Sequence, residues 1–236
     1  MTTYTLHYAP DNASLIIRMV LEELRVPYSV VLVDRQSKAQ HSAAYRSLNP
    51  VGRIPALETP DGPMFETAAI GLWLADRHRD TISLSPAPNA AERGSFLSWL
   101  FFLSNTVHAE LRTLFYPGTI VGPDERAQAC LAVQTRTNLT RHFDILNAAC
   151  NTQPHFGQDA ITFCDLYIAA LLRWPALYPV DADKAWLALS RWSALAQLAR
   201  RIELRDSAVS VARAEGLGPT PFSSPDLPNP PEGSAL

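Results

Sequence analysis

The chain has 236 residues, 47% of them hydrophobic, and its formal net charge is −3 at pH 7. A chain of this length buries a substantial core in one or two domains, and its charge provides no general attraction for nucleic acid phosphates. No uninterrupted apolar run reaches the roughly 18 residues that a membrane span needs. We therefore expect a protein that binds neither nucleic acid nor a membrane.

The three cysteines, Cys130, Cys150 and Cys164, are widely spaced and form no CxxC pair. Such a sparse, odd set is typical of a reducing compartment. The N-terminus lacks the basic region and long apolar run of a secretory leader, so we predict a cytoplasmic protein. No spacing of His, Cys and Asp residues indicates a metal site, and we expect no metal.

The first 80 residues alternate between strand and helix patterns. Short β-branched or aromatic runs indicate strands, and apolar residues three and four apart indicate helices. In chain order we predict a strand at 4–9, a helix from 14 that Pro27 ends, a strand at 28–33, a part-helical segment at 37–48, strands at 54–59 and 63–66, and a helix at 68–78. The first two strands should be parallel, and the last two, joined by a PDG turn, antiparallel. Asn12 or Ser14 is expected to cap the first helix.

Residues 79–92 form a polar, proline-bearing break, after which the pattern changes to long helices. These are predicted at 90–116, 123–149, 162–177, 182–199 and in a last piece that ends near 215. From residue 216 the chain is rich in Pro, Gly and Ser, which predicts an extended or disordered tail, part of which could fold over a site. The resulting domains are 1–80, a linker at 81–88, an all-helical domain at 89–215 and a tail at 216–236.

Two features stand out in the segment NPVGRIPALETPDGPMFETAAIGLWLADRH at 49–78. Pro55 cannot donate to a strand ladder, so it belongs at an edge or a turn. A cis Ile54–Pro55 bond would leave the Ile54 backbone groups open to an extended ligand. Glu66 and Thr67 stand at a helix start, where free N–H groups favour an anion. Together they would select the charged head of an amino acid.

This segment resembles the glutathione-binding segment of the cytosolic glutathione S-transferase superfamily, bacterial type, of a nu-like or beta-like class. The resemblance extends to LHYAPDNASLIIRMVLEELRVPYSVVLV at the start and to DAITFCDLYIAALLRW at 159–174, where Thr162 and Asp165 form a capping-box pattern. It implies an α+β fold, with an N-terminal thioredoxin-like βαβαββα domain followed by an all-α helical bundle. It also implies a homodimer that contains the third helix and the first long helix near its axis.

The resemblance assigns the parts of glutathione to particular residues. The Ile54 backbone beside Pro55 would hold the cysteinyl part, and Glu66 with Thr67 the γ-glutamyl end. Arg53 would reach the glycyl carboxylate. His41 lies near the region that supplies a further glycyl contact in some classes, although the spacing differs by one residue.

The residue that stabilises the glutathione thiolate is expected in YAPDNAS, which offers Tyr8, Asn12 and Ser14. Tyr8 resembles the tyrosine of a Tyr-x-Pro pattern, Asn12 resembles the asparagine donor of nu-like members, and Ser14 is also a natural helix cap. Ala13 beside Ser14 leaves this loop without the cysteine of beta-class and omega-class members. The donor stays open among the three.

The electrophile pocket is expected along the helix at 90–116, with Trp99, His108, Phe115 and Tyr116 as candidate lining residues, although each could also be ordinary core. The family resemblance predicts a transferase that directs the glutathione thiolate at a small hydrophobic electrophile, with glutathione peroxidase or disulfide reductase activity as an option. The alternatives are a non-catalytic binding or regulatory protein of the same fold and a glutathione-dependent lyase or etherase.

Overall fold

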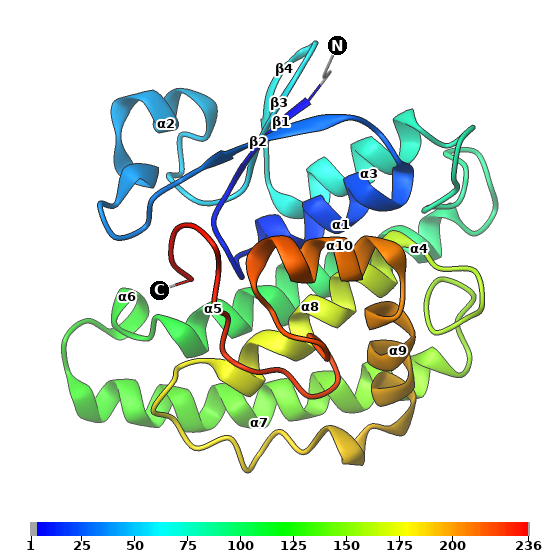
Figure 1. The fold of residues 1–236 in the computed structure, drawn as a ribbon. Coiled ribbons are helices and arrows are strands. Elements are labelled where there is room, and N and C mark those ends of the chain that lie inside the picture. The colour runs from blue at the N-terminus through cyan, green and yellow to red at the C-terminus, as the bar shows by residue number, and fades with distance from the viewer. Residues whose placement is uncertain (1–3, 236) are drawn as a thin grey trace.

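The structure, a computed structural model, describes residues 4–235 as a small sheet stacked on a larger layer of helices (Figure 1). The ends of the predicted first domain and tail, residues 1–3 and 236, lie outside the described residues. The sheet has the strand order β2-β1-β3-β4. Its strands are β1 (Tyr4–Tyr8), β2 (Tyr28–Leu32), β3 (Ala56–Thr59) and β4 (Gly62–Phe65).

The strand pairing confirms the predicted directions. β1 and β2 are parallel, and β3 is antiparallel to both β1 and β4. Pro55 lies immediately before β3, which is an interior strand, so of its two predicted settings the turn is found and the sheet edge is not.

Helices cover both faces of this sheet. They are α1 (Ser14–Leu24), the 3₁₀ turn η1 (Ala39–His41), α2 (Ala43–Leu48) and α3 (Thr67–Arg77). α1 and α3 lie between the sheet and the helical domain (Figure 1), whereas α2 covers the other side with a small separate core of Val33, Tyr45 and Ala56. The predicted cap of α1 is wrong, because the N-cap residue is Ala13 and no side chain caps it.

The first helix after the sheet domain begins at Arg93. Its elements are α4 (Arg93–Phe101), the π-helical segment η2 (Phe102–His108), α5 (Ala109–Phe115), α6 (Gly118–Val121), α7 (Glu125–Cys150), α8 (Phe163–Leu177), the 3₁₀ turn η3 (Leu189–Arg191), α9 (Ser193–Glu203) and α10 (Asp206–Glu215). α4, η2 and α5 are continuous and form the predicted first long helix. The capping box of Thr162 and Asp165 at the start of α8 is confirmed.

The predicted helix at 182–199 is wrong in its first half, because α9 begins only at Ser193. Its start is fixed from α7, where the Asn147 side-chain oxygen accepts bonds from the Ala194 and Leu195 N–H groups at 3.0 and 3.3 Å. The Trp192 indole also donates to Asp144 on α7 at 2.7 Å. These tertiary contacts override the helical spacing of the preceding residues.

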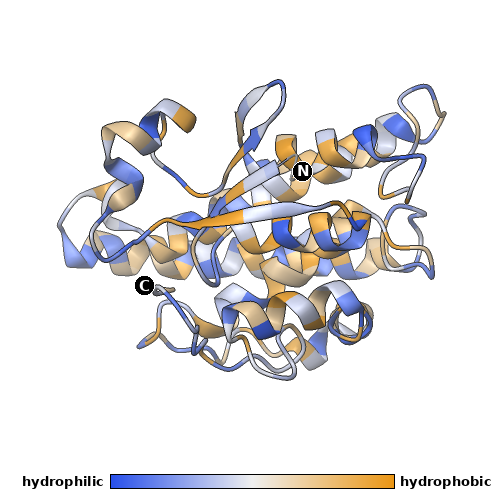
Figure 2. Ribbon diagram, turned by 45° about the horizontal axis from the view of Figure 1, so that its top comes forward, coloured by the Kyte–Doolittle hydropathy of each residue, from blue (hydrophilic) through white to orange (hydrophobic). Residues whose placement is uncertain are grey.

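The two domains meet along α1 and α3, which contact α8, and along α1 and α10. Apolar residues concentrate on the helix faces that point between these layers (Figure 2). Gly71 on α3 allows a close approach, since a Cβ there would lie 2.0 Å from Cζ of Phe163 at the start of α8. No helix within residues 4–235 is both long and apolar enough to cross a membrane.

The tail after α10 is extended and packs against the molecule. Leu217 and Phe222 are each only 1% exposed, and the Asn229 N–H donates to the Gly216 carbonyl at 2.8 Å. The tail then turns toward the lower end of the sheet, beside α5 (Figure 1). It reaches the ends of β1 and β2, where the candidate site lies.

Candidate active site

The loop before β3 presents backbone groups that the protein leaves open. The Ile54–Pro55 peptide bond is cis, as the sequence predicts. Among the described residues, the N–H and C=O of Ile54 make no hydrogen bond, since pairing with β1 begins only at Ala56. These groups are therefore free to bind an extended ligand as a short added strand.

Two buried residues that the sequence interpretation missed hold this loop in place. The Asn49 side-chain amide and the Tyr45 hydroxyl both donate to the Arg53 carbonyl at 2.7 Å. Gly52, at φ +68°, makes the tight turn between them. The Asn-Pro dipeptide at 49–50 was the available signal, because Asn side chains bond to nearby backbone in turns.

Glu66 and Thr67 occupy the start of α3, as predicted. Glu66 is the N-cap residue, with φ 70° and ψ 111°, a left-handed backbone conformation that a residue with a Cβ seldom adopts. Its carboxylate is exposed, and neither it nor the Thr67 hydroxyl bonds to another described residue. The first N–H groups of α3 are also free, so this helix end can accept a carboxylate beside a carboxylate that binds an ammonium.

Arg53 and His41 lie near this loop on the side away from Glu66. Arg53 is exposed and has no acidic partner in the described part of the chain. The imidazole of His41 is close to Gly52, where a Cβ would lie 3.0 Å from the His41 Nδ1 atom. Both side chains lie close to the loop, so their predicted role at an anionic end of a ligand stays a prediction.

The three candidate thiolate donors differ in what their polar groups already bond. The Tyr8 hydroxyl donates to a Glu232 carboxylate oxygen at 2.5 Å, and burial raises its pKa further. Ser14 is fully buried, and its hydroxyl donates to the Ala9 carbonyl at 3.1 Å. The partly buried Asn12 uses its side-chain oxygen on the Ala13 N–H at 3.0 Å, whereas its NH₂ group bonds to no described residue.

Three of the four predicted pocket residues lie in the later part of the helix formed by η2 and α5, with His108 at the end of η2 and Phe115 and Tyr116 at the end of α5. The His108 Nδ1 atom is 2.9 Å from the Tyr167 hydroxyl, and the ring lies 5.3 Å from the Trp174 ring. Burial, with Arg112 and Arg53 adding to it, lowers the pKa of His108 to about 4. The imidazole is therefore neutral at pH 7.

Tyr116 marks the far end of this stretch. Its hydroxyl accepts a bond from the Arg35 guanidinium at 3.0 Å, across the gap between the domains. The Arg112 guanidinium lies 5.6 Å from the Tyr116 ring. Phe115 points instead to the Tyr178 ring on α8, 6.2 Å away.

Trp99 lies apart from this group. Its ring packs edge-on against Phe102 at 5.8 Å and Phe156 at 5.3 Å, within the helical domain. Its contacts are those of core packing, the alternative that the sequence left open for each aromatic residue of this helix.

Sequence reasoning also missed a buried ionic network beneath the Asn12 loop. Asp11 accepts bonds from Arg173 at 2.8 and 3.0 Å, from Trp174 at 3.0 Å and from Tyr178 at 2.6 Å. Its own N–H donates to Glu215 at 2.9 Å. The sequence shows Asp11 only as part of a turn, and its partners lie on α8 and α10.

Within the described part of the chain, no group of three or more His, Cys, Asp or Glu side chains is placed to hold a metal ion. All three cysteines are free. Burial raises the pKa of Cys150 to about 12 and also raises that of Cys164, so both are inert core thiols.

Comparison with known proteins finds similarity to bacterial glutathione S-transferases. Residues 13–77 match the family described as the glutathione S-transferase N-terminal domain. GstA of Escherichia coli O157:H7 is 28% identical over 215 residues, which cover 90% of this chain and 98% of GstA. Glutathione S-transferase GST-4.5 of Xanthomonas campestris pv. campestris is 29% identical over 213 residues, with coverages of 90% and 98%.

One similar solved structure contains glutathione. A sphingomonad glutathione S-transferase complexed with glutathione is 28% identical and has a TM-score of 0.73, covering 91% of this chain and 100% of that one. The sheet order, the cis-proline loop, the open start of α3 and the helical second domain agree with the fold that the sequence resemblance implies. Over about 90% of its length the chain is similar to bacterial glutathione S-transferases, and residues 13–77 match the N-terminal domain of that family.

Proposed function

We propose that this protein is a glutathione transferase that activates the thiol of glutathione and directs it at a small hydrophobic electrophile. The open loop at Ile54 and the open helix start at Glu66 and Thr67 support the proposal, in a fold shared with a relative that was solved with glutathione. In this assignment the cysteinyl part bonds to the Ile54 backbone. The γ-glutamyl carboxylate docks on Thr67, its ammonium meets Glu66, and Arg53 with His41 serves the glycyl carboxylate.

We assign the thiolate donor to Asn12. The Tyr8 and Ser14 hydroxyls are engaged within the protein, whereas the Asn12 NH₂ group is free to donate. Lowering a thiol pKa from about 8.5 to about 6.5 requires about 2.7 kcal/mol of preferential stabilisation of the thiolate. One hydrogen bond to a charged acceptor contributes about 1.5–3 kcal/mol, so a single amide donor can supply most of it.

The reaction then needs little further chemistry from the protein. The thiolate sulfur attacks the electrophilic carbon, an S–C bond forms, and the leaving group departs with its bonding electron pair. The neutral His108 and the Tyr116 hydroxyl lie across the domain gap and can offer uncharged hydrogen bonds to the electrophile. Reduction of a peroxide would begin from the same thiolate.

Glutathione binding is the first test. Calorimetry should detect binding, and Glu66→Ala or Thr67→Ala should weaken it about 10- to 100-fold, as expected from the loss of a charge-assisted hydrogen bond. Asp61→Ala, in the exposed turn before β4, serves as the control and should bind normally. Unchanged affinity in the Glu66 and Thr67 variants would refute the assigned site.

Turnover is the second test, with chlorodinitrobenzene and cumene hydroperoxide as co-substrates. Asn12→Ala should lower kcat more than Ser14→Ala does; the reverse order would move the donor to Ser14. Glutathione binding without either activity would favour the non-catalytic binding protein or a lyase with a narrow substrate range.

We also propose that the protein is a homodimer in a cytoplasmic, reducing compartment. Phe101 on α4 is 49% exposed, on the helix that family resemblance places near the dimer axis. Light scattering after size exclusion should give twice the 26.0 kDa chain mass, and Phe101→Glu should shift it toward the monomer. A wild-type monomer would refute the dimer.

A further inference from the structure

The end of the tail lies over the ends of β1 and β2, next to the loop that carries Asn12. Glu232 reaches the Tyr8 hydroxyl at the end of β1, and the Arg35 guanidinium after β2 donates to the Ala235 carbonyl. Gly233 fits tightly here, since a Cβ would lie 2.7 Å from the Leu32 side chain and 3.4 Å from Pro10. Residues 230–235 therefore cover the carboxyl ends of both parallel strands, beside the Asn12 loop.

The earlier part of the tail is anchored from within the helical domain. Buried Arg173 donates to the Pro221 carbonyl at 3.0 Å and to the Asp226 carbonyl at 3.1 Å. Glu203 accepts bonds from the Ser223 N–H at 3.0 Å and from the Ser223 hydroxyl at 2.6 Å. These contacts hold residues 217–226 firmly against α8 and α9.

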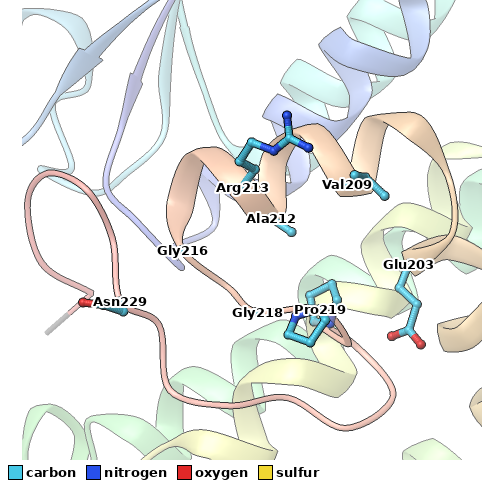
Figure 3. Close-up of a pocket in the computed structure, with 9 residues that line it drawn as sticks. Glu203, Val209, Ala212, Arg213, Gly216, Gly218, Pro219 and Asn229 are labelled. Atoms are coloured by element: carbon cyan, nitrogen blue, oxygen red, sulfur yellow. The ribbon is translucent and has the colours of Figure 1, made fainter.

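A pocket of about 440 Å³ lies behind this anchored part, between the tail and α10 (Figure 3). Gly216, Pro219 and Asn229 line it, and Asn229 closes it by bonding to Gly216. From Asn229 the chain continues to the end of β1, where Glu232 meets Tyr8.

The final segment lies on the surface, because residues 231–233 are exposed. Among its polar links to the body are the Glu232 bond to Tyr8 and, at residue 235, the bond from Arg35. A segment with few buried contacts and a firm anchor opens at low cost.

We propose that residues 230–235 form a strap that restrains the enzyme, and that Glu232 is its catch. In the closed state the Glu232 carboxylate accepts a hydrogen bond from the Tyr8 hydroxyl. It also places a negative charge beside the position that the thiolate would occupy. When the strap opens, the Tyr8 hydroxyl turns to the sulfur and becomes a second donor beside Asn12. This inference rests on the proposed function.

Two variants release the strap in different ways. Glu232→Gln removes the charge and keeps the shape, and truncation after Pro230 removes the segment. Both should raise kcat/KM with chlorodinitrobenzene about three- to tenfold, the factor that one additional hydrogen bond contributes. Both should also lower the pKa of the bound glutathione thiol, measured by the ultraviolet absorbance of the thiolate against pH.

Asp226→Asn is the matched control. This exposed tail carboxylate makes no side-chain hydrogen bond to a described residue, so its loss should leave kcat/KM and the thiol pKa unchanged. Introducing Tyr8→Phe into the Glu232→Gln variant should remove most of the gain, because the released donor is then missing.

The outcomes separate the strap from the proposed function. If neither the wild-type nor the truncated chain binds glutathione, the proposed function fails. If both bind it, and Glu232→Gln and the truncation leave kcat/KM and the thiol pKa at the wild-type values or raise the pKa, the strap is refuted alone. A gain in the truncated chain that Glu232→Gln does not reproduce would overturn the role of Glu232 as the catch.

Discussion

Asp11→Asn should destabilise the protein more than any comparable charge removal at its surface. Asp11 and Arg173 form an ion pair whose side chains are both 0% exposed, with Nε to Oδ1 at 2.8 Å and Nη2 to Oδ2 at 3.0 Å. Trp174 and Tyr178 add two further bonds to the same carboxylate. Asparagine keeps the size and tolerates the left-handed backbone at φ 51°, so the substitution removes the charge and one of the two acceptor oxygens with little change in volume.

The expected loss of stability follows from the positive charge of Arg173, which stays buried after the substitution. Arg173 would stay charged and buried without its counter-charge, and breaking a buried pair in this way costs about 3–5 kcal/mol. For a chain of 150–250 residues, each kcal/mol lowers Tm by about 2–4 °C, which predicts a fall of about 6–20 °C. Arg173 also donates to the Pro221 and Asp226 carbonyls, and these bonds reduce the loss of stability but do not supply the missing negative charge.

The assay is urea and thermal unfolding followed by circular dichroism, with Asp61→Asn as the control. Asp61 pairs with Arg77 at 3.2 Å, but both side chains are largely exposed, and such pairs contribute only about 0–1 kcal/mol. Equal stability of the two variants, or a loss below about 1 kcal/mol for Asp11→Asn, would refute the reasoning that burial makes this pair costly to break.

Further predictions concern the domain contact and the response to pH. Gly71→Ala should cost about 1–3 kcal/mol in urea unfolding because its Cβ would overlap Phe163, whereas Gly94→Ala, with no atom within 4 Å, should be neutral or stabilising. Burial outweighs the attraction of Arg18 and raises the pKa of Glu215 from 4.5 to about 7. Between these values the folded protein keeps a proton that the unfolded chain has lost, so this group's contribution to stability falls as pH rises. Glu215→Gln should flatten that slope in urea unfolding from about pH 5 to about pH 8, and an unchanged slope would contradict the assignment.

The sheet, α3 and the capping box of α8 could be predicted because their determinants are local. Strand periodicity, the PDG turn and the pair Thr162 and Asp165 each act within a few residues. The start of α9 could not be predicted, because it depends on Asn147 and Asp144 of α7, roughly 50 positions earlier. Helical spacing alone therefore placed that helix too early.

The candidate site also has one part whose determinants are local in the sequence and one part whose determinants are distant. The residues proposed to bind glutathione lie in one continuous segment, where an X–Pro turn and a helix start both leave signals in the sequence. The Tyr8 hydroxyl is instead fixed by Glu232, 224 positions away. Ser14 has the local pattern of a cap, but the loop folds back so that its hydroxyl bonds to Ala9. Neither the Tyr8 bond to Glu232 nor the Ser14 bond to Ala9 can be predicted from the local sequence.

The loop that carries Asn12 is shaped from the helical domain rather than by its own residues. Asp11, beside Asn12, adopts a left-handed conformation that costs about 1–2 kcal/mol for a residue with a Cβ, and Arg173, Trp174, Tyr178 and Glu215 hold it there. Arg173 also bonds to the tail carbonyls of Pro221 and Asp226. The tail anchor and the loop with the proposed donor Asn12 therefore share one side chain. The proposed binding residues lie in one segment, whereas the surroundings of the proposed donor are assembled from α8, α10 and the tail.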